Sequence, residues 1–441
     1  MILPTQIRQL LVPVALLATV SIPLSSWSAE STTLSLQRAE QLALQHNPAL
    51  TAAGKRAEAM AAAPPQVGSL PDPTVSFKAL NLPVDSFSTT QESMTQLQVG
   101  LSQSVPFPGK LKLKSQAAEE LAAAALANEQ ELRLVVLRNT RIHWWNLAYL
   151  DKALTIIRRN QSLLRNFVHI AEIKYKTGKG LQQDVLLAQL ELSKLLQRKL
   201  KLQGARQREE AELNALLGRA ADQPAILPAV NKANLIEVTS DLPTLKRWAR
   251  THRPMLQAMN HLLDAADFRL ALAERDYYPD FNIGAAYGIR SGVNPATGRS
   301  RADITSIMVS MSLPIYTSSR QDRAVDQRIA EKEVARFRWQ DAANHVDANI
   351  DAAASDLRTA HDQVVLYEKG ILPQARQTTT SMLAGYQVNK VDFLNLVRAQ
   401  LSEFNLDIQY WQQVSAYNQA AARLAAAAGR EQIIEEIDSH E

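Results

Sequence analysis

The feature that most constrains this chain is a long stretch that contains neither glycine nor proline. It covers residues 110–177, which is 68 positions (178 − 109 − 1) between Gly109 and Gly178. Glycine and proline are the residues that most often end or break a helix, so this stretch predicts a single helix about 100 Å long at ~1.5 Å per residue. A chain of 441 residues built around such a helix is not a set of ordinary compact domains.

An apolar stripe in the middle of this stretch indicates side-by-side packing with other helices. Its members recur alternately three and four residues apart from Leu147 to Ala171, and Gln161 is the one polar member. The segment Thr177-Gly178-Lys179-Gly180 then breaks the pattern, and a second helical stretch runs from Leu181 to about Leu217. Because short breaks usually join antiparallel neighbours, a long helical hairpin is expected.

The chain repeats its own plan about two hundred residues later. Four landmarks recur in the same order at nearly constant offsets. They are Pro48-Ala49-Leu50 and Pro254-Met255-Leu256 (254 − 48 = 206), Pro71-Asp72-Pro73 and Pro279-Asp280-Phe281 (279 − 71 = 208), Ser104-Val105-Pro106 and Ser312-Leu313-Pro314 (312 − 104 = 208), and Tyr175 and Tyr386 (386 − 175 = 211). We therefore expect a first structural repeat at residues 29–218, a linking equatorial segment at 219–252, a second repeat at 253–428 and a C-terminal tail at 429–441.

Each repeat also contains two segments with apolar residues at every second position, which is the pattern of a β-strand. The apolar positions are Val75, Phe77 and Ala79; Leu97, Val99 and Leu101; Phe281, Ile283 and Ala285; and Ile307, Val309, Met311 and Leu313. The segments have about the 9 to 11 residues of a tilted membrane-spanning strand. Four strands cannot close a barrel, and an open sheet edge cannot face lipid, so strands in a membrane would require a barrel shared between chains. Two soluble β-hairpins packed on helices are the alternative.

The N-terminus indicates export. Arg8 precedes the apolar run Leu10 to Ile22, and Ser26-Trp27-Ser28 supplies small residues at a cleavage site, so residues 1–28 are predicted to be a signal peptide.

Composition excludes several classes of function. The chain has no cysteine, which excludes thiol catalysis, disulfides and thiolate metal sites. Its 48 basic and 44 acidic residues leave a net charge of +4, too small and too dispersed to indicate a nucleic-acid partner. The eight histidines show no metal-ligand spacing, and no nucleophile, phosphate-loop or dinucleotide motif is found. We therefore expect no enzyme activity, no catalytic residue, no cofactor and no metal site.

Several motifs resemble the TolC family of outer-membrane efflux proteins, across essentially the whole mature chain. They are Asn47-Pro48-Ala49-Leu50, the duplicated strand pairs, and the two hairpin-tip sequences at residues 175–186 and 385–394. Two proline-rich segments, Leu70-Pro71-Asp72-Pro73 and Val105-Pro106-Phe107-Pro108-Gly109-Lys110, resemble the branch associated with cobalt, zinc, cadmium, copper and silver efflux.

The resemblance implies a mainly α fold with a small β membrane part. It implies a homotrimer in which each chain gives four strands to one 12-stranded β-barrel, continued by a periplasmic α-helical barrel. It also implies contact with outer-membrane lipid, docking to a periplasmic adaptor (membrane fusion) protein, and an inner-membrane efflux pump that is expected to be proton-driven.

The resemblance assigns roles to the two hairpin tips. Adaptor docking is expected at one set of residues: Gly178, Lys179, Gly180, Leu181, Asn389, Lys390 and Val391. Lys174 and Lys176 lie beside the first tip. A periplasmic gate is expected at Asp184, Asn395 and Arg398. Since Asn395 and Arg398 stand where the best-known family member has two aspartates, an acidic double ring is not expected, and Arg398 is expected to pair with an acidic neighbour. From the residues alone, the tips would read as solvated turns.

The expected function is that of a passive exit duct of a tripartite efflux system that exports heavy-metal cations. A general drug or solvent duct is the alternative within this class, because duct architecture says little about cargo. A periplasmic coiled-coil scaffold is the alternative from another class.

Overall fold

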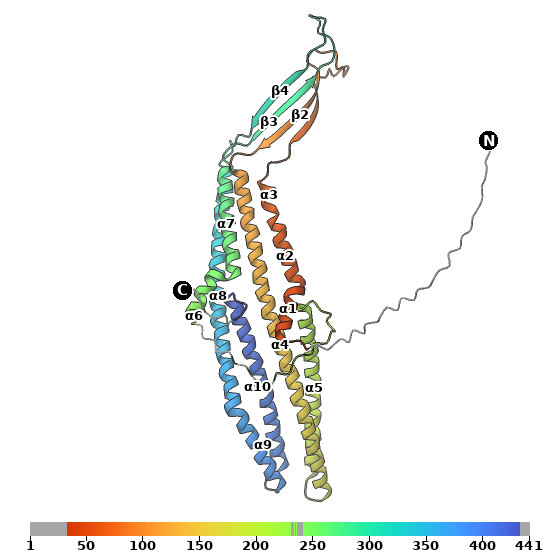
Figure 1. Ribbon diagram of the computed structural model, residues 1–441, viewed down its shortest axis with the longest axis vertical. Coiled ribbons are helices and arrows are strands. Elements are labelled where there is room, and N and C mark those ends of the chain that lie inside the picture. The colour runs from red at the N-terminus through yellow and green to blue at the C-terminus, as the bar shows by residue number, and fades with distance from the viewer. Residues whose placement is uncertain (1–32, 231–232, 234, 236–240, 433–441) are drawn as a thin grey trace, which may run out of the picture.

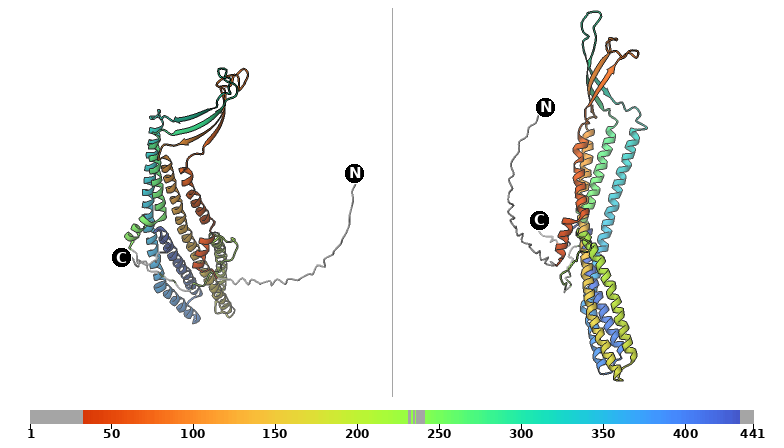
Figure 2. Two further views of the ribbon diagram at one scale, coloured as in Figure 1. Left: turned by 45° about the horizontal axis from the view of Figure 1, so that its top comes forward. Right: turned by 90° about the vertical axis from the view of Figure 1, so that its right-hand side faces the viewer.

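The computed structural model describes residues 33–230, 233, 235 and 241–432. The predicted signal peptide at 1–28 and residues 433–441 of the predicted tail lie outside the described residues, as do parts of the predicted equatorial segment. The described chain is elongated, with a small sheet at one end and two long helical hairpins that point to the other end (Figure 1). Both views in Figure 2 show the same arrangement.

The first copy of the duplicated plan contains five helices and two strands within the described residues. They are α1 (Leu36–His46), α2 (Pro48–Ala61), α3 (Ala63–Gly68), β1 (Thr74–Leu80), β2 (Gln96–Val105), α4 (Lys110–Lys176) and α5 (Gln182–Leu216). The long helix predicted from the absence of glycine and proline is confirmed as α4, and the predicted hairpin is confirmed as α4 with α5.

The second copy follows a short helix α6 (Leu242–His252). Its elements are α7 (Pro254–Arg275), β3 (Phe281–Ile289), β4 (Ile304–Met311), α8 (Gln321–Leu366), a π-helical turn η1 (Tyr367–Ile371), α9 (Leu372–Gln387) and α10 (Phe393–Ala427). Among the described residues, no helix has the length and apolar character needed to cross a membrane.

The two copies contain long helices of equal length. From Gln321 to Gln387, α8, η1 and α9 run without a break for 67 residues (387 − 321 + 1), and α4 also has 67 residues. Only the second carries a π turn, in which the Leu372 N–H bonds to the carbonyl of Tyr367, five residues back. Pro373 follows directly, and a proline lacks the N–H for its i−4 carbonyl and clashes with it. The wider turn relieves that clash with Lys369.

The four strands form one antiparallel sheet in the order β1-β2-β3-β4, so β2 and β3 join the two copies. The register of the strands places one residue from each strand side by side across the sheet: Val75, Leu101, Ala285 and Ile307. Two residues further along β1 on the same face, Phe77 lies beside Val99, and Val99 lies beside Tyr287. Ser76, Gly100, Ala286 and Ser306 share the opposite face. One face is therefore apolar and open, with Phe77 79% and Ile307 80% exposed.

The predicted strands are confirmed in position, but β1 has 7 residues and β4 has 8 instead of the 9 to 11 expected. Asn81 follows the strand with a positive φ of 54°, which turns the chain, and its carbonyl accepts a hydrogen bond from the Thr95 hydroxyl. Pro71 and Pro73 precede the strand and supply no ladder donor there.

A buried lysine joins the sheet to the helices. The Lys110 ammonium lies 2.9 Å from an Asp280 carboxylate oxygen and 3.1 Å from Asp276, and it donates to the Tyr278 carbonyl. The Phe107 N–H also donates to Asp280, at 2.8 Å. Burial alone would raise the pKa of Asp280, but these two donors outweigh it and hold that pKa below its ordinary value. Two of the motifs identified in the sequence thus meet at this junction.

A second junction, at mid-length, appears once in each copy. Gly218 ends α5 at φ 66°, and Gly429 ends α10 at φ 77°, 211 residues later (429 − 218). Beside them, Asn47 Nδ2 donates to the Leu216 carbonyl at 3.0 Å, and Arg253 Nη1 donates to the Ala427 carbonyl at 3.0 Å. Asn47 directly precedes α2 and caps the end of α5, and Arg253 directly precedes α7 and caps the end of α10. The same capping arrangement therefore occurs in both copies.

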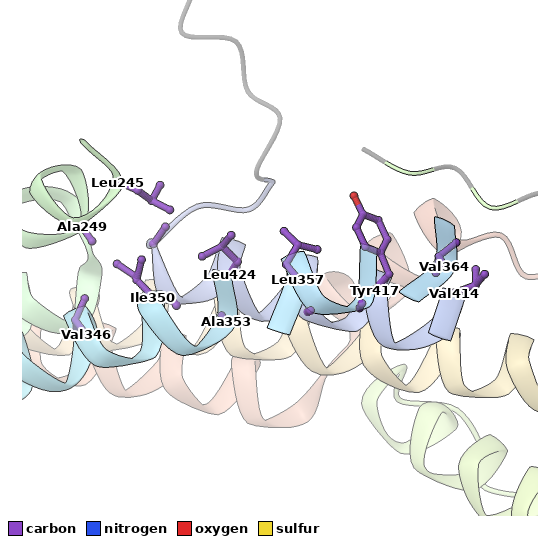
Figure 3. Close-up of a cluster of buried hydrophobic side chains, with 14 of the residues drawn as sticks. Leu245, Ala249, Val346, Ile350, Ala353, Leu357, Val364, Val414, Tyr417 and Leu424 are labelled. Carbon is purple, nitrogen blue, oxygen red and sulfur yellow. The ribbon is translucent and has the colours of Figure 1, made fainter. Parts of the chain in front are cut away.

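The apolar core beside Arg253 and Gly429 is formed by side chains of α6, α7, α8 and α10. Figure 3 shows Leu245 and Ala249 of α6, five side chains of α8, and Val414, Tyr417 and Leu424 of α10. This cluster holds α6, which lies in the segment predicted as an equatorial linker, against the long helices. A separate cluster lower down joins α4, α5, α9 and α10.

We expect Gly218→Ala to lower the free energy of unfolding by at least about 1–2 kcal/mol, because the backbone is left-handed there. A Cβ would also overlap the His46 carbonyl oxygen. Thermal unfolding followed by circular dichroism checks this. Gly204→Ala in the middle of α5 is the matched control, since its nearest neighbour would be 3.8 Å away. The control should stabilise by up to about 1 kcal/mol. An unchanged midpoint for Gly218→Ala would contradict the close approach of Gly218 to His46 at the end of α1.

Candidate functional site at the hairpin tips

The two hairpin tips have the same backbone structure. At the first, Gly178 has φ 68°, its N–H donates to the Tyr175 carbonyl at 3.0 Å, and the Lys179 N–H donates to the Lys174 carbonyl at 2.8 Å. At the second, Asn389 has φ 60° and makes the equivalent bond to Tyr386, and the Lys390 N–H donates to Gly385 at 2.9 Å. This is the Schellman ending, in which glycine or asparagine accepts the left-handed position.

Lys174 connects the two tips. Its ammonium donates to Asn389 Oδ1 at 2.9 Å and to the Tyr386 carbonyl at 3.2 Å. The same nitrogen lies 3.8 Å from the centre of the Tyr386 ring, within the range of a cation–π contact. One side chain of the first hairpin therefore binds the turn of the second. The sequence placed Lys174 beside the first tip but offered no signal for its partner.

A cleft of about 540 Å³ lies between the tips. Seven of the ten predicted docking and gate residues line it: Lys179, Gly180, Leu181, Asp184, Asn389, Lys390 and Val391. Lys174, Gln183, Tyr386, Asp392, Phe393 and Leu394 complete the lining. Gly178, Asn395 and Arg398 are not part of it. Residues from two distant parts of the sequence thus form one surface.

The cleft combines buried aromatic side chains with apolar side chains and charged side chains of both signs. Tyr386 and Phe393 are buried with their ring centres 5.5 Å apart, and Phe167 packs edge-on to Phe393 at 6.3 Å. Leu181 on the rim is 59% exposed, and Lys179 and Lys390 lie in exposed turns. Such a surface is suited to bind a protein segment that presents apolar side chains and charges complementary to these lysines and aspartates.

The three predicted gate residues occupy different environments. Asp184 lies in the first turn of α5, where a negative charge is favoured by the helix dipole. Burial, and after it the charge of Asp184, raises the pKa of the nearby Tyr386 hydroxyl. Asn395 is the equivalent position in the second copy (184 + 211 = 395), and its side chain and backbone N–H both donate to Asp392.

Asp392 is the tip residue that the sequence analysis missed. It is the N-cap of α10, and its carboxylate accepts from the Asn395 N–H at 2.8 Å. An aspartate just before an apolar helical pattern is a recognised N-cap signal and could have identified it. Arg398 is exposed on α10, and within the described part of this single chain no hydrogen bond or ion pair reaches it. Its expected acidic partner is not found there.

Three metal-ligand side chains meet away from the tips, although no metal site was expected from the sequence. They are Glu120 of α4 and His261 and Asp264 of α7. The histidine spacing gave no signal, because the carboxylate that completes the cluster lies 141 residues away in the sequence.

Comparison with known proteins gives consistent matches. Residues 39–219 and 246–430 match the family described as outer membrane efflux protein. The cobalt-zinc-cadmium resistance protein CzcC of Cupriavidus metallidurans is 23% identical over 410 residues, which covers 90% of each chain. The outer membrane protein VceC from Vibrio cholerae has a TM-score of 0.75 at 21% identity over 90% of this chain and 96% of its own. CusC has a TM-score of 0.76 at 17% identity, over 90% and 93%.

We expect Lys174→Met to loosen the contact between the hairpins, because it removes contacts worth about 1 kcal/mol at this partly exposed position. The chain has no cysteine, so spin labels on Thr177→Cys and Val388→Cys would report the distance between the two tips of a chain, alongside the distances between chains of a trimer. The distance within the chain is the one that tests this prediction. That distance should lengthen and its distribution broaden. Lys176→Met, a change at the exposed neighbour, should leave both unaltered. Equal distributions for the two variants would show that Lys174 does not hold the tips together.

Proposed function

The chain belongs to the outer membrane efflux protein family, and from that membership we propose that it is the passive exit duct of a tripartite efflux system. The family is an outer-membrane one, which argues against the alternative of a periplasmic coiled-coil scaffold. The observation that carries the proposal is that an open apolar sheet lies at one end of the chain and a cleft lined by apolar and charged side chains lies at the other.

The sheet supports a homotrimer. Within the described part of the chain, strands β1 and β4 each have one edge without a partner strand, and no helix covers the apolar face (Figure 2). Unpaired backbone groups in lipid cost several kcal/mol each, so the edges must meet other strands there. In the proposed assembly, three copies supply twelve strands to one barrel, and their helices continue it as an α-helical barrel.

The tip cleft supports docking to a periplasmic adaptor protein that is bound to an inner-membrane pump. Docking would use the residues around Gly178 and Asn389 that turn each hairpin, together with the exposed leucine at 181. In the proposed gate, Asp184 and Asn395 face the channel mouth, and Arg398 pairs with a carboxylate of a neighbouring chain. The absence of a partner for Arg398 within the described part of one chain is consistent with such a pairing.

Heavy-metal cations are the proposed cargo. The support is the similarity to CzcC, whose name refers to cobalt, zinc and cadmium resistance, over 90% of both chains. The two proline-rich segments at residues 70–73 and 105–110 also resemble the heavy-metal branch of the family. The second of them contributes Phe107 and Lys110 to the junction between the sheet and the helices. A general drug or solvent duct is the competing cargo class.

Deletion of this protein should sensitise cells to zinc, cobalt or cadmium salts and leave tolerance to antibiotics and detergents unchanged. The measurement is growth of a deletion strain and its complemented parent over a panel that also includes nickel, copper and silver. Sensitivity to drugs and detergents with normal metal tolerance would replace the proposed cargo with the competing class.

Gly180→Glu should reduce resistance to the level of the deletion strain while trimers still form. A Cβ at this position would lie 2.9 Å from Lys174 Cβ and 3.3 Å from backbone atoms, which distorts the docking surface. Gly178→Asn is the matched control, because its Cβ would meet no atom within 4 Å and asparagine already occupies the equivalent position at 389. The control should keep full resistance. Full resistance with Gly180→Glu as well would remove the tips from the docking proposal.

A further inference from the structure

A cluster of three side chains joins the two copies of the fold near the sheet. Glu120 lies on α4, ten residues after the helix begins and so about 15 Å along its axis. His261 and Asp264 lie on α7, three residues apart and hence on one helix face. The helices α4 and α7 come from different copies, so this cluster lies across the contact between them (Figure 1).

The three donor atoms are already close together. His261 Nδ1 lies 2.7 Å from Glu120 Oε2, and one donor atom from each of the three residues lies within 4.8 Å of the others. Ligand bonds of about 2.0–2.2 Å to a zinc-like ion fit this spacing after small side-chain movements. The His261 side chain is 37% exposed and that of Glu120 is 27% exposed, so an ion can enter from solvent.

The donor set selects a class of metal. One imidazole nitrogen with two carboxylate oxygens suits zinc and neighbouring divalent transition metals. Calcium and magnesium prefer oxygen ligands throughout, so the imidazole disfavours them. Three protein ligands would leave one position of a tetrahedral ion for water.

The surrounding charge also favours a cation. Glu120 and Asp264 bring two carboxylates together, and the adjacent Asp267 is already paired with Lys332 at 2.5 Å. A bound divalent ion would offset the repulsion between these carboxylates.

We propose that Glu120, His261 and Asp264 form a binding site for a divalent transition-metal ion of the zinc type, which links α4 to α7. The site does not depend on the cargo of the proposed function. Its structural effect is to tie the first copy of the plan to the second, next to the sheet.

The experiment uses the full mature protein in detergent, purified without a histidine tag and stripped with chelator. Zinc chloride is titrated by calorimetry, and cobalt chloride is followed by visible absorption. We expect one ion per chain and a rise in the unfolding midpoint with zinc. His261→Gln and Glu120→Gln should each weaken binding by at least about tenfold, since even changes beyond the ligands cost that much in known sites.

Two variants serve as controls. His345→Gln alters another histidine next to an aspartate, Asp341 at 3.8 Å, that lies outside any three-residue cluster in the described part of the chain. Asp267→Asn alters the neighbouring carboxylate that is paired with Lys332. Both should bind zinc as the unaltered protein does. Asp264→Asn provides a third ligand variant if His261→Gln does not form trimers.

Equal zinc affinity in the ligand variants and the unaltered protein, or no binding by the unaltered protein, would overturn the site. Either result could coexist with normal metal export, which would leave the proposed function standing. Zinc binding lost only in the ligand variants would support the site even in a protein whose deletion sensitises cells to drugs alone.

Discussion

The architecture depends on how very long helices end. The last carbonyls of an α-helix have no partner within the helix, and here four long helices end with a left-handed residue that turns the chain and returns those hydrogen bonds. Gly178 and Asn389 do this at the tips, and Gly218 and Gly429 do it at mid-length. The tip residues Gly178 and Asn389 are 211 residues apart (389 − 178), and so are Gly218 and Gly429 (429 − 218). The helices between these endings therefore have equal lengths in the two copies. The sheet and the tips are therefore held a defined distance apart, at opposite ends of the chain.

Much of the fold could be predicted because it depends on local properties of the chain. The absence of glycine and proline predicted α4 to within about a residue, and alternating apolar positions predicted all four strands. The turn residues predicted where the hairpins reverse. The tip and strand motifs then predicted the family, which the comparison confirms over most of the chain. What escaped prediction in the strands was the length of β1 and β4. The turn at Asn81, where a single residue has a left-handed backbone, ends β1 early.

The site could be predicted only in part, because its contacts depend on which helices become neighbours. Lys174 could be placed at a tip, but its partner lies 215 residues away on the other hairpin. Glu120 and His261 are likewise brought together by the packing of α4 on α7 and not by their spacing. Lys110 belongs to a recognised motif, yet its burial between two carboxylates follows from the way the sheet meets the helices. Local patterns predict elements, whereas the chemistry between elements needs the tertiary structure.

The π turn before Pro373 makes the two otherwise matched hairpins mechanically unequal. Helix α4 is uninterrupted over 67 residues, whereas its counterpart has a joint at 367–371 where the regular hydrogen-bond ladder is locally replaced. In the proposed trimer, six hairpins of nearly equal length would alternate between a stiff kind and a jointed kind. The outline of the helical barrel would then be close to sixfold while its bending stiffness repeats only threefold. In that trimer, duplication of the chain would give six hairpins of similar length, and the π turn before Pro373 would divide them into two kinds that differ in stiffness.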